Sequence, residues 1–307
     1  MSNEELDALL AQVRRSTRSQ SRAMVKALND YSTSAPETCI LACDTRALGG
    51  KQRSTVAKSR LYHRGWRLAF LTAWNVGDHL TAIGDVASTA SPRVFAHMTL
   101  ARAALEGAAR VHYLLDPQGT TAERVLRAAA LLLASAEEEL KAVDEFRGVN
   151  DQLHVAAQTA AQARHADVAD LIKRAGISPR HSKTKRGPLL GVEAVGSMDS
   201  ATLPVISTLL RQLIPDKPAA YRVSSGVVHS QPWVLDDEDA FHPPSRELRW
   251  PLDPVALAGS VDLGITASIL VINDFAAVLG QDAQPQQREA DRREQAVSRI
   301  AQTLRTD

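Results

Sequence analysis

The sequence predicts an all-α protein, a single multi-helix bundle domain with two long loops. The chain of 307 residues is 44% hydrophobic but only 4% aromatic, and its abundant Ala and Leu are typical of closely packed helices. Apolar residues recur at three- and four-residue spacing over long stretches, which indicates amphipathic helices. No stretch alternates polar and apolar residues convincingly, as a half-buried strand would. We therefore expect about seven to nine helices.

The same patterns divide the chain into three parts. Residues 1–50 are expected to form an N-terminal helix and a linker, residues 51–280 the helical bundle domain, and residues 281–307 a charged C-terminal helix. This length is ample for an apolar core that needs no disulfide or metal. The net charge of +1 excludes polyanion binding by the surface as a whole, so any nucleic-acid surface must be a local patch.

The N-terminal helix is expected over residues 4–31, and it carries a basic stripe opposite its apolar face. The stripe consists of Arg14, Arg18, Arg22 and Lys26. A solvated helix face is favoured over a phosphate-binding surface for this stripe. The linker that follows holds Cys39 and Cys43, and the chain has no second cysteine pair to complete a zinc site. We interpret both as small buried or half-buried thiols, and no disulfide, metal or other cofactor is expected.

Helix signals mark the central part of the chain. Ser91-Pro92 resembles an N-cap followed by proline in the first turn, and Thr120 with Glu123 forms a capping-box pattern. Gly176 and Pro254 indicate a helix end and a helix start. The helices are expected over residues 55–89, 91–115, 123–147, 150–175, 201–214, 217–228, 254–279 and 284–305.

Two stretches lack helical periodicity and are expected to be loops. Residues 177–200 hold two prolines, three glycines and a basic cluster. The cluster consists of Arg180, Lys183, Lys185 and Arg186. Such a cluster is usually a solvated loop, but beside an RNA site it would hold phosphates. The second loop, residues 230–251, contains the acidic run 236–239 and several prolines.

One polar cluster is expected where two central helices meet. It consists of Asp78 and His79 on one helix with Arg102 and Glu106 on the next. Glu106 lies among small apolar residues, and a buried carboxylate needs a cationic partner. Arg102, one turn earlier, is the expected partner, and His79 is the alternative. The cluster either fixes the helix register or binds a ligand, and the sequence leaves both open.

A second polar cluster lies in residues 221–229. Arg222 and His229 are seven positions apart, which at about 100° per residue places them on one helix face, with Tyr221 and Ser225 beside them. Histidine can act as general acid or base, and arginine can hold a phosphate and stabilise its transition state. The pair suffices for metal-independent attack of an RNA 2′-OH on its own phosphate. Alternatively, the histidine caps the helix and the arginine forms a surface ion pair.

Arg222-x6-His229 on a late helix of an all-α chain resembles the R-x4-6-H motif of the HEPN superfamily, whose members include many ribonucleases of toxin–antitoxin, abortive-infection and CRISPR systems. The resemblance implies that Arg222 and His229 are catalytic, with Ser225 in support. It also implies a homodimer and a cognate antitoxin or regulatory protein as partner. More broadly, residues 70–235 resemble a group of uncharacterised bacterial helical proteins, which brings a fold but no activity.

We therefore expect a metal-independent endoribonuclease that acts on RNA, with Tyr221 and the basic cluster of residues 180–186 as binding groups. The alternative is a non-catalytic protein that recognises a small ligand or nucleotide through Arg102, Glu106 and His79. A metal enzyme is disfavoured because no second glutamate motif is placed as a di-iron bundle requires. A cytoplasmic location without a membrane segment is expected, because the chain starts without an apolar signal core and residues 263–279 look too short and polar to span a bilayer.

Overall fold

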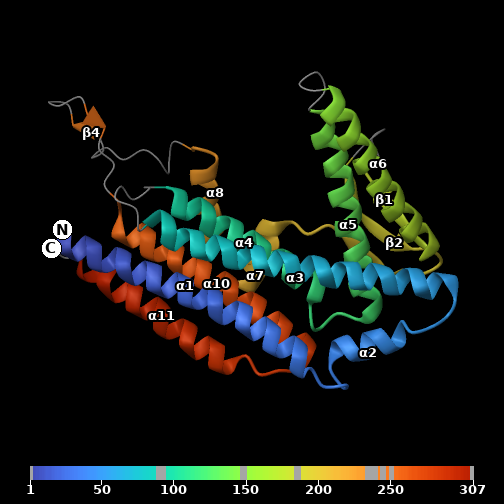
Figure 1. Ribbon diagram of the computed structural model, residues 1–307, viewed down its shortest axis with the longest axis horizontal. Helices are drawn as coiled ribbons and strands as arrows, with labels where there is room; N and C mark the ends of the chain where they lie inside the picture. The colour runs from blue at the N-terminus through green and yellow to red at the C-terminus, as the bar shows by residue number, and fades with distance from the viewer. Residues whose placement is uncertain are drawn as a thin grey trace. The chain divides into compact units, whose positions relative to one another are not determined.

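The computed structural model describes residues 3–87, 95–145, 151–182, 188–231, 241–242, 247–248 and 252–304. The predicted all-α class is confirmed: the structure is 78% helical, with ten helices and one small three-stranded sheet among the residues it describes (Figure 1). The first helices are α1 (Asn3–Ser34), α2 (Ile40–Ala47), α3 (Arg53–Ala87), α4 (Ala96–Leu115), α5 (Thr121–Asp144) and α6 (Asp151–Arg174). The later ones are α7 (Ile206–Leu213), α8 (Ala220–Val228), α10 (Pro254–Leu279) and α11 (Gln284–Thr303).

Two compact units make up the fold. Unit 1 consists of Met1–Ala35, Leu71–His112 and Val205–Asp307, and unit 2 consists of Pro36–Phe70 and Tyr113–Pro204. The boundaries fall within α3 and α4, so each unit is built from segments far apart in the sequence. The three parts expected from the sequence are, by contrast, consecutive stretches of the chain.

Unit 1 is organised around α10. Asp253 caps this helix by accepting a hydrogen bond from the backbone N–H of Val255, and Gly280 ends it in the left-handed conformation with φ of 66°. The helix packs against α1 and α11, and its buried residues cover most of its circumference. The residues exposed along one side are Val255, Gly259, Asn273 and Ala277. Most of its apolar surface is therefore covered inside unit 1, and the homodimer stays a prediction.

The length of α10 corrects one expectation. It has 26 residues and is, among the described residues, the one helix long and apolar enough to cross a membrane. Within its most apolar window, 61% of the residues are buried in the structure. The expectation that this segment is too short and too polar to span a bilayer is therefore wrong for its length and composition. Core helices of soluble proteins share this length and composition. The cytoplasmic location stays a prediction.

Unit 2 contains the main departure from the predicted secondary structure. The expected loop over residues 177–200 is instead an antiparallel sheet in the order β1-β2-β3, formed by β1 (Ile177–His181), β2 (Leu189–Ala194) and β3 (Ser200–Thr202). Ile177, Leu189 and Val192 bury their side chains in the same apolar cluster as α5 and α6. At Gly191 a Cβ would lie 2.0 Å from the carbonyl oxygen of Ala201, so this close strand pairing requires glycine.

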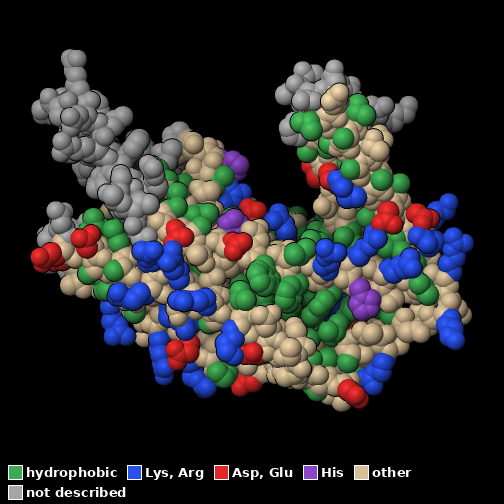
Figure 2. Space-filling model, viewed as in Figure 1, with side chains coloured by type: hydrophobic (Ala, Val, Ile, Leu, Met, Phe, Trp, Pro, Cys, Tyr) green, Lys and Arg blue, Asp and Glu red, His purple; other side chains and the backbone are tan. Residues whose placement is uncertain are grey.

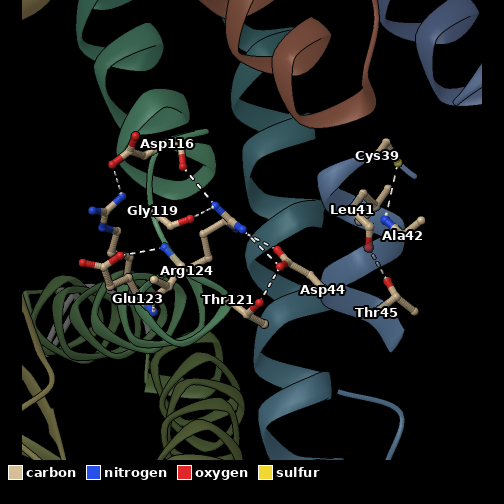
Figure 3. A network of polar contacts seen from close by, with 12 residues as sticks. Cys39, Leu41, Ala42, Asp44, Thr45, Asp116, Gly119, Thr121, Glu123 and Arg124 are labelled. Carbon is tan, nitrogen blue, oxygen red and sulfur yellow. Dashed lines mark hydrogen bonds and ion pairs between the residues drawn. The ribbon is translucent and has the colours of Figure 1, made fainter. Parts of the chain in front are cut away.

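The expected linker over residues 32–50 contains a further helix, α2. Cys39 is buried and its Sγ caps this helix by accepting the N–H of Ala42, at 3.4 Å, whereas Cys43 is exposed. Both cysteines are free, and the burial expected for them is confirmed for Cys39 and is wrong for Cys43. Asp44 of α2 forms a buried ion pair with Arg124 of α5, and Thr121 donates to the same carboxylate at 2.6 Å (Figure 3). This network ties the segment to the core of unit 2.

Several boundaries shift by a few residues. The helix expected from residue 201 begins at Ile206, because residues 200–202 form β3, and the helix expected from residue 217 begins at Ala220. The second long loop contains a two-stranded antiparallel ladder of β4 (Phe241–His242) and β5 (Glu247–Leu248). Ser91-Pro92 and the acidic run 236–239 lie outside the described residues.

Candidate functional site

The helix α8 ends in a tight capping turn that fixes the position of His229. The N–H of Ser230 donates to the carbonyl of Val227 at 3.0 Å, and the N–H of Gln231 donates to that of Gly226 at 2.9 Å. These two bonds form a Schellman motif. It requires a left-handed residue, and Ser230 supplies it with φ of 48° where glycine is more common. His229 consequently occupies the C-cap position through its backbone, and among the described residues its side chain forms no hydrogen bond to the helix.

Arg222 and His229 line the same cavity. It has a volume of about 510 Å³ and lies between α7 and α8. Its lining residues are Ser207, Arg211, Pro218, Tyr221, Arg222, Ser225, Gly226, His229 and Gln231. Tyr221 and Ser225, expected beside the pair, are therefore in the wall as well. The spacing of seven positions places both side chains on one face, as helix geometry requires.

The electrostatic character of this cavity is one-sided. Among the residues that the structure describes, its lining includes two arginines and a histidine but no aspartate or glutamate. Among the described residues, the side chains of Arg222, Ser225 and His229 form no hydrogen bond or ion pair, and Arg222 and His229 are exposed. The surface ion pair considered as an alternative for Arg222 is therefore not formed within the described part of the chain. An anion is the ligand that this cavity favours.

The other polar cluster meets the cavity through Tyr221. Arg102 Nε donates to Glu106 Oε1 at 2.9 Å, so the predicted pairing is confirmed. The Tyr221 hydroxyl lies 3.3 Å from Arg102 Nη2 and 3.4 Å from Glu106 Oε1, and the Arg102 guanidinium lies over the tyrosine ring, 5.2 Å from its centroid. The ion pair thus holds a tyrosine that forms part of the cavity wall.

The burial of this pair is partial. The side chains of Arg102 and Glu106 are 14% and 22% exposed, and Arg110 approaches the second carboxylate oxygen at 3.7 Å. Full burial of Glu106, expected from its small apolar neighbours, is therefore wrong. Those neighbours have another role, because a Cβ at Gly107 would lie 2.7 Å from a methyl group of Val76. The small residues let α4 approach α3 closely.

Asp78 and His79 do not join this network. Asp78 is exposed and His79 is half-buried, and among the described residues neither forms a hydrogen bond or ion pair with Arg102 or Glu106. Burial lowers the pKa of His79, and the charge of Asp78 opposes that shift. The alternative pairing of Glu106 with His79 is consequently not present in the described part of the fold.

The expected basic cluster is only partly described. Arg180 lies in β1 of unit 2, where its Nη2 donates to the Thr202 hydroxyl at 2.9 Å, and it does not line the cavity of unit 1. Lys183, Lys185 and Arg186 lie outside the described residues. The role of this cluster in holding RNA stays a prediction.

Sequence reasoning missed Arg211, which lines the cavity from α7. Its guanidinium bonds within its own helix, to the Ser207 carbonyl at 3.3 Å and the Thr208 hydroxyl at 3.2 Å. A short connection with two prolines, residues 214–219, joins α7 to α8. That connection was the available signal, because a short link between two helices makes them neighbours.

No cluster of metal ligands forms among the residues that the structure describes: no three of their His, Cys, Asp and Glu side chains are placed to hold one ion. His79, Glu106 and His229 form no such cluster. Figure 2 shows histidine and basic side chains beside α8, which is the short orange helix above α4 in Figure 1. No protein-family model, curated protein or solved structure matches this chain.

Proposed function

We propose that this protein is a metal-independent endoribonuclease that uses Arg222 and His229. The observation that carries the proposal is that both side chains line one cavity, in which the described residues include no carboxylate and offer neither side chain a hydrogen-bond partner. A positively charged cavity attracts the phosphodiester backbone. The imidazole adds the proton-transfer group that simple phosphate binding does not need.

The reaction needs one proton removed and one supplied. The 2′-oxygen of the substrate attacks the adjacent phosphorus and loses its proton, while the bond from phosphorus to the 5′-oxygen breaks and that oxygen takes up a proton. The products are a 2′,3′-cyclic phosphate and a free 5′-hydroxyl. His229 takes the first proton or gives the second, and in a dimer two copies of His229 divide these tasks. Arg222 binds the non-bridging oxygens and stabilises the charge of the pentavalent transition state.

The neighbouring side chains position this pair. Ser225 lies between Arg222 and His229 in the cavity wall, where its hydroxyl donates to the phosphate. Tyr221 is held by Arg102 and Glu106 and supports the helix turn that carries Arg222. The proposal includes a homodimer in the cytoplasm and a cognate antitoxin or regulatory protein as partner, and light scattering at micromolar concentration tests the dimer.

The test is cleavage of labelled single-stranded RNA in the presence of a chelator. General acid–base catalysis by one histidine is worth about 10²–10⁴-fold, so His229→Ala should lose cleavage by that factor. The matched control is His165→Ala, because His165 lies in α6 and does not line the cavity. Both variants should keep the thermal unfolding midpoint of the wild-type protein. Equal cleavage by wild type and His229→Ala would contradict the proposal.

The second candidate is a non-catalytic binding protein. The observation that favours it is a cavity of about 590 Å³ in unit 2, with an apolar floor that includes Leu126 and Ile177 and with Lys58 and Asp199 at its polar edge. Ligand cavities commonly have this size and mixed lining. Arg102 and Glu106 line neither this cavity nor the one between α7 and α8. Absence of RNA cleavage by the wild-type protein would favour this candidate.

A further inference from the structure

The cavity between α7 and α8 holds a second arginine that cleavage at one phosphate does not require. Arg222 lies on α8 and Arg211 on α7, and both line the same 510 Å³ space. The side chain of Arg211 uses its Nε and one terminal nitrogen for bonds to its own helix. Its other terminal nitrogen has no hydrogen-bond partner among the described residues, so it remains available to a ligand.

The charges of the cavity call for more than one phosphate. A phosphodiester has one negative charge, whereas the described part of the lining offers two guanidinium groups and no carboxylate. Two like charges in one cavity repel each other, and binding one phosphate leaves the second guanidinium without a counter-charge. Guanidinium groups bind phosphate oxygens in pairs through parallel N–H groups, so one arginine suffices for one phosphate. Two phosphates therefore match the two arginines.

The size of the cavity agrees with this count. Its volume lies in the range of about 300–1,000 Å³ that accommodates whole drug-sized ligands, and a single phosphate group would fill a small part of it. Ser207 and Gln231 add neutral hydrogen-bonding groups to the lining. Such groups serve a sugar or a base next to the phosphates.

We infer that Arg211 binds a second phosphate next to the scissile one, so that the substrate is an RNA strand with at least two consecutive phosphodiesters. This inference rests on the proposed function. Arg211 is a binding residue that determines substrate length. Arg222 binds the phosphate at which the chain is cut. A dinucleotide with a single phosphodiester then occupies the cavity without contacting Arg211.

The experiment measures binding of 2′-O-methyl oligonucleotides, which lack the attacking hydroxyl and cannot be cleaved by the proposed reaction. The probes are a dye-labelled dinucleotide with one phosphodiester and a trinucleotide with two, both without terminal phosphates. The wild-type protein should bind the trinucleotide about 10-fold more tightly, as one charge-assisted hydrogen-bonded contact implies. Arg211→Gln should remove this preference, and Arg222→Gln should weaken both probes.

A neutral linkage identifies the phosphate that Arg211 contacts. Two further trinucleotides each replace one phosphodiester with an uncharged methylphosphonate. With one of them Arg211→Gln should have no effect on affinity, and with the other it should keep its full effect. The slope of log affinity against log salt for the natural trinucleotide should fall by roughly 0.7 in Arg211→Gln, since one phosphate contact is lost. Arg22→Gln, on the exposed surface of α1, is the matched control and should leave affinity unchanged.

The outcomes separate this inference from the proposed function. Equal weakening of dinucleotide and trinucleotide by Arg211→Gln, or no binding of either probe, overturns the inference. Cleavage of natural RNA can still be present in the first of these cases, and then the ribonuclease stands without the second phosphate site. Loss of the trinucleotide preference in Arg211→Gln, with no cleavage of natural RNA, supports the phosphate site and overturns the ribonuclease. The thermal unfolding midpoint of each variant shows whether it is folded.

Discussion

Two arginines of this protein, Arg124 and Arg222, have opposite surroundings. Arg124 is 5% exposed, and its guanidinium donates to Asp44 Oδ2 at 2.7 Å, to Asp44 Oδ1 at 3.0 Å and to the carbonyl of Asp116 at 3.1 Å (Figure 3). Arg222 is exposed in a cavity wall and has no hydrogen bond among the described residues. The protein itself provides the partners of Arg124, whereas Arg222 is open to solvent.

This difference separates a structural role from a binding role. Moving a charge out of water costs several kcal/mol, and only a partner of excellent geometry offsets that cost. Arg124 has such a partner in Asp44, so a ligand could bind it only by breaking the buried pair. An anion that replaced water at the exposed Arg222 would not disturb the fold. Arg124 and Arg222 have the same residue type and charge, so the difference in their roles comes from burial and from the hydrogen bonds that each side chain forms.

The largest expected effect tests the structural side of the comparison. Asp44→Ala leaves the guanidinium of Arg124 buried without its counter-charge, and we expect a loss of about 3–5 kcal/mol in the free energy of unfolding, measured by urea denaturation. The control is Asp167→Ala, which breaks the exposed pair with Arg64, where the side chains of Arg64 and Asp167 are 41% and 53% exposed. That change should cost about 1 kcal/mol or less. Equal losses in the two variants would show that burial does not determine how much an ion pair of this protein contributes to stability.

An intermediate effect is expected at the pair of Arg102 and Glu106, which is only partly buried. Glu106→Gln removes the negative charge beside Arg102, whose Nη1 already lacks a hydrogen-bond partner in the described structure. We expect a loss of about 1–3 kcal/mol, toward the lower end because water reaches both groups. Thermal or urea unfolding measures it.

The control for that pair is Glu138→Gln, which breaks the exposed pair with Lys141 and should leave the free energy of unfolding nearly unchanged. Because Tyr221 contacts both Arg102 and Glu106, Glu106→Gln should also weaken oligonucleotide binding. An unchanged unfolding midpoint in Glu106→Gln would show that this pair contributes nothing to stability.

The sequence predicted helix bounds and contacts within a helix best, because these depend on local signals. The bounds of α10 agree with the prediction because Pro254 and Gly280 mark its ends, and the pairing of Arg102 with Glu106 followed from four-residue spacing on one helix. The sheet of unit 2 was missed because its strands are short and contain Pro179 and Gly191. Those residues favour loops in isolation, and burial of Ile177 and Val192 against α5 and α6 outweighs that preference.

The candidate site shows the same limit. Arg222, Ser225 and His229 lie within one short helix and its cap, so their common face follows from helix geometry. Arg211 belongs to another helix, and only the packing of α7 on α8 brings it into the cavity. The partner of Arg124 could not be predicted either, because Asp44 is 80 residues away in the sequence. Contacts that depend on tertiary packing leave no local pattern.

The smallest expected effect concerns Glu294, whose surroundings lie between those of Arg124 and Arg222. Burial and the charge of Asp262 raise its pKa above the ordinary value of 4.5, and Lys217 opposes the shift. Lys217 also pairs with Asp262, and Asp291 adds a further negative charge. The folded state therefore binds a proton at Glu294 more tightly than the unfolded chain does. The resulting stabilisation is complete below pH 4.5 and is lost as the pH rises through the folded pKa.

Glu294→Gln should remove this pH dependence, because glutamine has no proton to lose. The free energy of unfolding at pH 7 should rise by a few tenths to about 1 kcal/mol, since solvent reaches the group and screens its interactions. Urea denaturation at several pH values between 4.5 and 7 measures both effects. Glu289→Gln on the same helix is the control, because Glu289 faces Arg292 and Arg293 instead of a carboxylate. If Glu294→Gln keeps the wild-type pH slope, then Glu294 is hydrated like Arg222 and does not occupy an intermediate setting.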